Sequence, residues 1–433
     1  MPDLMNQTID AASANAPQWL QERQSAGRAV WAQAALPTRK TEAWKYTSLR
    51  ALDRSFDAAE PSAASAAELG LDYPHFGGPT LVFVDGYLRE DLSQIQIPAG
   101  VQLVRFADAN ETQTELIQKH LGSAVDSSRH LFANLSDAAL SDGIFVQIEA
   151  EADVTEPLHL IWLTTTGETA FTVNQRLLVL CGVNSRASLI EHFDSTGNGN
   201  AFTNGITELV LEDGATFHHH RLHMEEDSAM HIGGVHARLA KDSTLESFHL
   251  ALGSALKRID VVINHDGPGA HCGLNGVYLL RKEEHVDYHT CIEHASPHCT
   301  TDEVFRGIIG DSARAVFNGR IHIHPDAQKT RAELSNRNLL TSAQAEINTK
   351  PELEIYADDV QCAHGATIAQ LDGETMHYLQ TRGISRQEAE IMLSYGFINE
   401  VIDSVALESL RDYLRPLLAK RFSADPQLTR HLI

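Results

Sequence analysis

Short apolar segments separated by turn residues fill the chain from about residue 144 to residue 372. Small residues open successive segments at Ala187, Ala215, Ser243 and Ala270, at spacings of 28, 28 and 27 residues. A second apolar segment follows halfway through each unit, with no helical pattern between the two. A fixed period in this range is typical of a solenoid, so the sequence predicts a mainly β fold with a right-handed parallel β-helix core over 144–372. An antiparallel sandwich is the alternative, but it explains a constant period less well.

Helical and mixed patterns flank this core. A helix is predicted over 17–35, where Pro17 suits the first turn and a rough stripe follows at Leu20, Gly27, Trp31 and Ala34. From residue 80 an apolar segment enters an Asp-Gly turn, which indicates a β-hairpin, and 110–140 is partly helical. The predicted regions are an N-terminal helical region, a mixed α/β lead-in, the β-helix core and a C-terminal helical region, at 1–70, 71–143, 144–372 and 373–433.

The C-terminal region carries two apolar helical stripes. Ser385 and Glu388 match a capping box at the start of the first helix. Its apolar face holds Ile391, Met392, Tyr395, Ile398 and Ile402. The second stripe holds Leu407, Leu410, Leu414, Leu417 and Leu418, and Pro416 should bend or end that helix. Such stripes either pack on the end of the β-helix or form a docking surface for a partner.

Composition narrows the class of protein. The 433 residues carry a formal net charge of −24, which argues against nonspecific binding to nucleic acid or to an anionic membrane. Apolar runs such as 158–163 are too short to span a bilayer, and the N-terminus lacks the pattern of a secretion signal. The five cysteines are odd in number and do not form a disulfide framework. We therefore expect a cytoplasmic protein with reduced thiols.

The strongest local candidate for chemistry is the sequence Cys362-Ala363-His364-Gly365. The preceding segment alternates as a β-strand, with Leu353, Ile355 and Ala357 on one face, and Gly365 predicts a turn. Cys362 and His364 are two residues apart, so an extended backbone places both on the same face. A thiol and an imidazole there can bind a soft metal or relay a proton. The alternative is a small buried cysteine and a structural histidine.

Histidine clusters supply further candidates among the chain's 23 histidines. His289, Cys291 and Glu293 alternate on one face of a predicted strand and have the ligand types of a zinc or iron site. His322 and His324 share a face of another strand, and a further cluster comprises His218, His219, His220 and His223. Outward polar positions on a solenoid are the alternative explanation for all of them. The sequence after His324 lacks the glutamate of a cupin metal motif, so that fold is set aside.

Several kinds of chemistry lack their motifs. The chain has no GxxxxGK[ST] loop for ATP and no GxSxG nucleophile elbow. It also has no CxxC pair, so the chain alone lacks an obvious cage for an iron–sulfur cluster. Asp358 and Asp359 are adjacent, and neighbouring strand residues point to opposite faces, which disfavours joint acid–base catalysis.

Two sequence blocks resemble one known family. The run NTKPELEIYADDVQCAHGAT at 348–367, preceded by GRIHIH and KTRAELSNRNLLTS, is similar to the signature region of the SufB/SufD family, the β-helical subunits of an iron–sulfur cluster assembly complex. The block LPTRKTEAWKYTSL at 36–49 resembles the N-terminal signature of that family. Within the family the chain is more similar to the SufD branch than to the SufB branch. The order and separation of the blocks extend the resemblance over most of the chain.

The resemblance implies partners and a site. It implies pairing with a SufB paralogue, so that a transient iron–sulfur cluster forms at their interface while SufC supplies ATP hydrolysis. His364 falls on the interface histidine of the family, as a ligand or proton-transfer group facing a SufB cysteine, with Cys362 as a ligand or local support. The C-terminal stripe from Ile391 to Ile402 is implied to dock SufC. Sulfur reaches SufB from a cysteine desulfurase and its carrier.

Three points complete the expectations. The chain alone is expected to be a non-catalytic scaffold that holds no cofactor. The sequence does not say whether a flavin takes part in the complex. In isolation it can form a homodimer through the strands at 340–365, because a solenoid edge needs covering. The functional alternatives are a β-helical enzyme acting on polysaccharide and a purely structural interaction protein in which His364 has no role.

Overall fold

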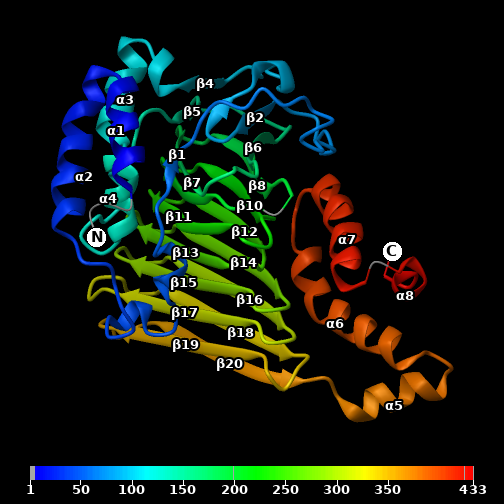
Figure 1. The fold of residues 1–433 in the computed structure, drawn as a ribbon. Coiled ribbons are helices and arrows are strands. Elements are labelled where there is room, and N and C mark those ends of the chain that lie inside the picture. Colours follow the sequence, from blue (N-terminus) through cyan, green and yellow to red (C-terminus); the bar gives the residue numbers. More distant parts are fainter. Residues whose placement is uncertain (1–4, 198, 424, 433) are drawn as a thin grey trace.

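The fold is a parallel β-solenoid flanked by helices (Figure 1). The computed structural model describes residues 5–197, 199–423 and 425–432. Residues 1–4 of the predicted N-terminal region, residue 198 of the predicted core, and residues 424 and 433 of the predicted C-terminal region lie outside the described residues. Two ten-stranded sheets face each other across the core, and their strands build about eight turns. This architecture confirms the predicted mainly β fold with a parallel solenoid and helical flanks.

Successive strands alternate between the two sheets. Sheet A contains β1 (Asp57–Ala58), β4 (Val101–Arg105), β5 (Ile144–Ile148), β7 (Phe171–Cys181), β9 (Phe202–Leu211), β11 (Met230–Leu239), β13 (Leu256–His265), β15 (His285–His294), β17 (Arg314–Ile323) and β19 (Glu346–Ile355). Sheet B contains β2 (Thr80–Val84), β3 (Tyr87–Leu88), β6 (Leu158–Thr164), β8 (Arg186–Ser195), β10 (Thr216–His223), β12 (Thr244–Leu252), β14 (His271–Leu280), β16 (Thr300–Ile309), β18 (Arg331–Leu340) and β20 (Gln361–Gln370).

Parallel pairing runs through the whole core. From β5 to β18 each strand pairs in parallel with the strand two places further along the chain. The described antiparallel strand pairs, β2 with β3 and β4 with β5, lie at the first end of the solenoid. The antiparallel sandwich is therefore excluded. The predicted hairpin at residue 80 is confirmed, with Asp85 and Gly86 both at positive φ in its turn.

The predicted repeat is present, but its first member was misplaced by two residues. The strand register aligns Ser185, rather than Ala187, with Ala215, Ser243 and Ala270. Two further residues, Cys299 and Thr330, continue this column, and backbone hydrogen bonds of 2.8–3.1 Å join each member to the next turn. All six are buried. Only small side chains fit where the chain turns between the two sheets, and this explains the periodic signal.

Helices cover the outer faces of both sheets. The helices are α1 (Asn6–Asn15), α2 (Gln21–Gln33), α3 (Glu111–His120), α4 (Leu131–Ala138), α5 (Gly373–Thr381), α6 (Arg386–Asp403), α7 (Glu408–Phe422) and α8 (Pro426–Thr429). Short 3₁₀ turns occur at Gln18–Leu20, Glu42–Trp44, Leu49–Leu52, Glu90–Leu92 and Phe106–Asp108. Within the described residues, no helix has both the length and the apolar character needed to cross a membrane.

The N-terminal helices pack on sheet A. Trp31 of α2 and Phe132 of α4 join one apolar cluster with Phe202 and Met230 from β9 and β11. The predicted helix at 17–35 is present as a 3₁₀ turn followed by α2, whereas α1 was not predicted. Gly27 allows α2 and α4 to touch, because a Cβ there would lie 2.6 Å from the amide nitrogen of Ala138.

The C-terminal helices pack on the outer face of sheet B, not on the end of the solenoid. Ile398 and Leu414 share an apolar cluster with Leu250 and Val277 from β12 and β14. Pro416 does not end the second helix, because α7 continues to Phe422.

Of the two hydrogen bonds in the predicted capping box at the start of α6, the one to the Ser385 side chain is formed. The Ser385 side chain accepts a hydrogen bond from the backbone N–H of Glu388. The Glu388 carboxylate instead lies 3.0 Å from Arg430 and 3.1 Å from His431. Glu388 therefore ties the end of the chain to α6.

Charged groups also lie inside the solenoid. Glu191 is 1% exposed, and it accepts hydrogen bonds from His219 at 2.9 Å, Arg221 at 2.7 Å and Thr207 at 2.8 Å. Glu303 is equally buried, but among the described residues it accepts only from Thr290, at 2.7 Å. Burial raises the pKa of Glu303 to about 7, and the bond from Thr290 opposes that rise only in part.

We predict that Glu303→Gln stabilises the protein in a pH-dependent way. The folded state holds the proton of Glu303 up to about pH 7, whereas the unfolded chain releases it near 4.5, so wild-type stability falls between these values. Glutamine does not titrate, so the variant avoids this loss. Its free energy of unfolding should exceed that of the wild type by on the order of 3 kcal/mol at about pH 8 and by little at about pH 5. Urea unfolding of the variant and the wild type at both pH values measures this difference in the free energy of unfolding. Glu333→Gln, at an exposed position on β18, serves as the control. An equal effect of the two substitutions would contradict the assignment.

Candidate functional site

The sequence around His364 is a strand, not a turn. Residues 361–370 form β20, which pairs in register with β18 along all ten residues. The predicted turn at Gly365 was wrong because a continuous parallel ladder outweighs the local preference of one glycine. β20 ends sheet B and β19 ends sheet A, so both strands carry an open edge at the last turn of the solenoid (Figure 1).

Cys362 and His364 share one face of β20, as predicted. Their register partners on β18 are Ala332 and Leu334, and both partners belong to the core. The two side chains therefore continue the inward columns of the solenoid at its open end. In the part of the chain that the structure describes, no further turn covers them, so Cys362 is half-buried and His364 is exposed. Burial raises the pKa of the Cys362 thiol, and a backbone hydrogen bond from Ala332 opposes that rise.

Apolar side chains surround this open end. Leu353 and Ile355 of β19 continue the columns of core residues Ile321 and Ile323, which confirms their predicted common direction. Because the stack stops here, Ile355 is 41% exposed. Tyr356 and Ile368 are 61% and 52% exposed. The last turn thus combines unpaired strand edges with exposed apolar groups, which are the features of a surface that another β-sheet can cover.

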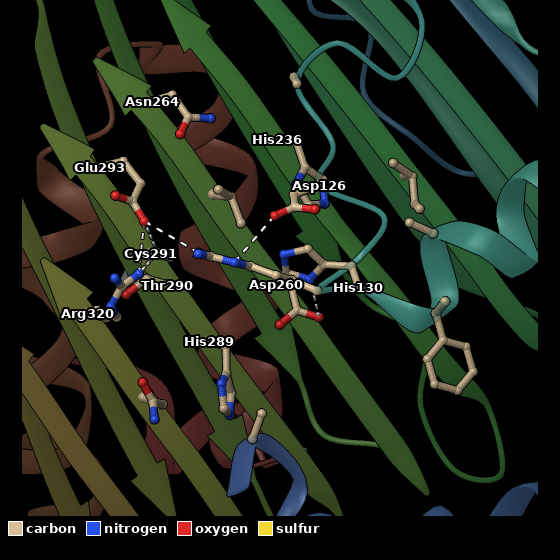
Figure 2. A pocket seen from close by; sticks show the side chains of 18 of the residues that line it. Asp126, His130, His236, Asp260, Asn264, His289, Thr290, Cys291, Glu293 and Arg320 are labelled. Atoms are coloured by element: carbon tan, nitrogen blue, oxygen red, sulfur yellow. Dashed lines mark hydrogen bonds and ion pairs between the residues drawn. The ribbon is translucent and has the colours of Figure 1, made fainter. Parts of the chain in front are cut away.

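A second group of polar side chains lies on the outer face of sheet A. Glu293 Oε2 is 2.5 Å from His322 Nδ1 and 3.0 Å from His324 Nε2, while Oε1 accepts a hydrogen bond from Arg320 at 2.9 Å. Burial raises the pKa of Glu293, but the bond from His324 and the charges of His322 and Arg320 outweigh it, so this pKa is about 2. A cavity of about 550 Å³ opens beside this group (Figure 2).

The predicted trio His289, Cys291 and Glu293 does not form one site. Figure 2 shows Cys291 and Arg320 close to Glu293, with His289 farther along the same face. His289 Nε2 lies 3.1 Å from Asp287 Oδ1, and Cys291 Sγ lies 3.1 Å from Arg320. The side chains that converge on Glu293 are instead those of Arg320 and His322 on β17 and of His324, which directly follows β17. The sequence analysis named Glu293 in one cluster and His322 and His324 in another. It could not place them together, because their contact depends on the register between β15 and β17.

The remaining histidine cluster is divided between the two faces of sheet B. His219 lies inside the solenoid against Glu191, whereas His220 packs on the outer face near Phe248. His223 and His231 flank the buried Glu225, whose Oε1 lies 2.8 Å from His231 Nδ1. Buried Lys257 already places its ammonium 3.4 Å from Glu225 Oε2.

The predicted docking stripe on α6 faces the chain's own core. Ile391, Tyr395, Ile398 and Ile402 are buried. Their amphipathic pattern reflects packing within the molecule, although Tyr395 also lines the surface groove beside Met392. Met392 is half-buried, and it lines a surface groove with Asn399, Arg415 and Leu432.

Comparison with known proteins places the chain in a family. A model described as "SufBD protein N-terminal region" matches residues 2–160, and one described as "SUF system FeS cluster assembly, SufBD core domain" matches residues 163–397. The fold and these matches define a protein of the iron–sulfur cluster assembly class. The chain belongs to the SufBD family of that class.

Individual relatives agree with this assignment. The chain is 31% identical to the iron–sulfur cluster assembly protein SufD of Escherichia coli over 393 residues, which is 89% of each chain. It is 30% identical to an iron–sulfur cluster assembly SufBD family protein of Synechocystis sp. over 398 residues, 89% of this chain and 87% of the relative. SufD of Bacillus subtilis is 25% identical over 76% of both chains.

We predict slow alkylation of Cys362 in the free, folded chain. Its raised pKa leaves little thiolate near neutral pH, and most of its side chain is covered, so iodoacetamide should react several-fold more slowly than with the same cysteine in urea. Peptide mapping by mass spectrometry measures both rates. Equal rates in the folded and unfolded chain would show that the fold does not protect Cys362.

Proposed function

We propose that the chain is a cytoplasmic, non-catalytic scaffold subunit of an iron–sulfur cluster assembly complex. Its open end pairs with a SufB paralogue, and a nascent cluster forms at that interface from sulfur delivered to SufB by a cysteine desulfurase and its carrier. SufC supplies the ATP hydrolysis. The observation that carries this proposal is the uncovered last turn, where His364 and Cys362 extend the core columns toward a partner.

The geometry of the open end supports pairing with another β-solenoid. Strands β19 and β20 leave backbone donors and acceptors unpaired along their outer edges. The exposed Ile355 and Ile368 lie on the same turn. A partner that extends both sheets satisfies these backbone groups and buries the apolar ones. In the free chain a second copy can serve the same purpose, which gives a homodimer.

The donor count supports a shared cluster site. Cys362 and His364 offer two donors at the open end, whereas iron–sulfur clusters are held by about four protein ligands. The cluster is therefore cargo of the pair, and the partner supplies the missing thiolates. Within the described residues, His364 has no hydrogen-bonded side-chain partner of its own, so its imidazole is available for a ligand or proton-transfer role.

The C-terminal helices support SufC docking at a groove that includes Met392 and Tyr395 of the predicted stripe. The groove beside Met392 also exposes the polar groups of Asn399 and Arg415. It lies on α6 and α7, away from the strands that end the solenoid. SufC and the SufB paralogue can therefore bind the chain at the same time.

We predict that His364→Ala removes the cluster but leaves the complex intact. The side chain is exposed in the free chain, so its loss should not disturb folding. The complex of this chain with its SufB-like and SufC-like partners is reconstituted with iron and a sulfur source, and the iron–sulfur absorbance is compared with that of the wild type. Gln361→Ala, an exposed position on the same strand, should assemble clusters normally.

The outcomes separate the proposed role from its alternatives. If the His364→Ala complex forms and assembles clusters at the wild-type level, the chain is a structural counterpart and His364 has no part in assembly. If the wild-type chain forms no complex with the partners, the pairing itself is wrong. Release of reducing sugar from polysaccharide by the free chain would favour the enzyme alternative.

We predict that Ile368→Lys weakens association with the SufB paralogue by about tenfold or more, because a charge is then buried in an apolar contact. Ile368 is 52% exposed in the free chain, so the thermal unfolding of the Ile368→Lys variant should differ little from that of the wild type. Sedimentation velocity measures both this association and self-association. The matched control is Ile95→Lys, at a position 46% exposed near the first end of the solenoid. Equal effects at both positions would contradict the assignment of the interface.

A further inference from the structure

We propose that Glu293, His322 and His324 form a binding site for a divalent transition-metal ion on the outer face of sheet A. The site is separate from the open end of the solenoid, where cluster assembly is proposed, and it uses residues of this chain alone. Its carboxylate oxygen and two ring nitrogens all lie within 4.8 Å of one another, which is the spacing that one bound ion requires.

The parallel ladder assembles these three residues. Glu293 on β15 and His322 on β17 are register partners, and His324 follows the last residue of β17 on the same face. Glu293 Oε2 lies within hydrogen-bonding distance of both rings, at 2.5 Å from His322 Nδ1 and 3.0 Å from His324 Nε2. The two rings thus converge on one oxygen. A cation bound between them can take all three atoms as ligands.

Arg320 orients the carboxylate without occupying the site. Its Nη1 donates to Glu293 Oε1 at 2.9 Å, while its Nε and Nη2 donate to the two carboxylate oxygens of Glu354 at 2.9 and 3.1 Å. This contact accounts for Oε1 alone and leaves Oε2 directed at the two imidazoles. Partners that fix one ligand oxygen in this way are a regular feature of metal centres.

Access distinguishes this group from the other candidate in the described chain. His223, Glu225 and His231 are fully buried and closed to solvent. Glu293, His322 and His324 have side chains that are 13%, 18% and 41% exposed, beside the cavity of about 550 Å³. An ion can therefore reach Glu293 from solvent and keep water ligands.

The donor set selects the class of ion. Two imidazoles and one carboxylate favour Zn²⁺, Fe²⁺ and Co²⁺ over Mg²⁺ and Ca²⁺, which prefer oxygen ligands. Three protein ligands on one side leave positions for water or another small ligand. Cys291 Sγ lies 3.5 Å from Glu293 Oε1, so a thiol is adjacent to the site.

The experiment uses the full chain without an affinity tag or partner proteins. Co²⁺ titration followed by visible absorption, with Zn²⁺ as competitor, reports stoichiometry and coordination. We expect one site that loses affinity by at least about tenfold in Glu293→Gln and in His322→Ala. Thermal unfolding in a chelator should show that both variants are folded.

His289→Ala is the matched control, because His289 lies on the same strand and lines the same cavity but pairs with Asp287. It should bind Co²⁺ with wild-type affinity, and so should His364→Ala. Binding that is unchanged in Glu293→Gln would overturn the site. The absence of stoichiometric binding of Co²⁺ and Zn²⁺ at millimolar free metal would also overturn it. Neither result bears on cluster assembly by the complex, so the two proposals can fail separately.

Discussion

Parallel stacking in register is the constraint on which the rest of this structure depends. Each inward position of the solenoid lies above its equivalent one turn away, so a residue must suit both neighbours as well as its own strand. The column from Ser185 to Thr330 satisfies this rule with small side chains at a tight corner. Interior Glu191 satisfies it by pairing with Arg221 from the next turn of sheet B, whereas interior Glu303 keeps its proton up to about pH 7. The same stacking carries Cys362 and His364 to the end of the core.

The flanking helices leave two surfaces uncovered, the last turn of the solenoid and the part of sheet A beside Glu293. The N-terminal helices cover part of sheet A and the C-terminal helices cover sheet B (Figure 1). Segment 42–47 also crosses the outer face of sheet A, where Arg258 lies over the ring of Trp44 and Thr47 bonds to Asp287. This arrangement directs association to β19 and β20, because their edges are the ones left open at that end.

Sequence reasoning succeeded where the signal was periodic and failed where it depended on register. A nearly regular spacing of small residues was enough to predict the solenoid, although Ala187 was taken for Ser185. Gly365 was assigned to a turn because a local glycine preference gives no information about a partner strand. Glu293 and His322 lie 29 residues apart, one turn of the solenoid, so their contact depends on a register that no local pattern shows. An amphipathic stripe on α6 likewise cannot distinguish the chain's own sheet from another protein.

The last turn of the solenoid has only one adjacent turn, and this affects the lifetime of the free chain. In a stacked array each unit is stabilised by the interfaces on both of its sides, and the final unit has only one. Opening of the native state should therefore begin at β19 and β20 and spread toward the first turns. An orphan subunit offers these loosened strands to proteases and to other sheet edges. Capping by a partner closes that route, so the abundance of this protein is coupled to the abundance of whatever covers its end.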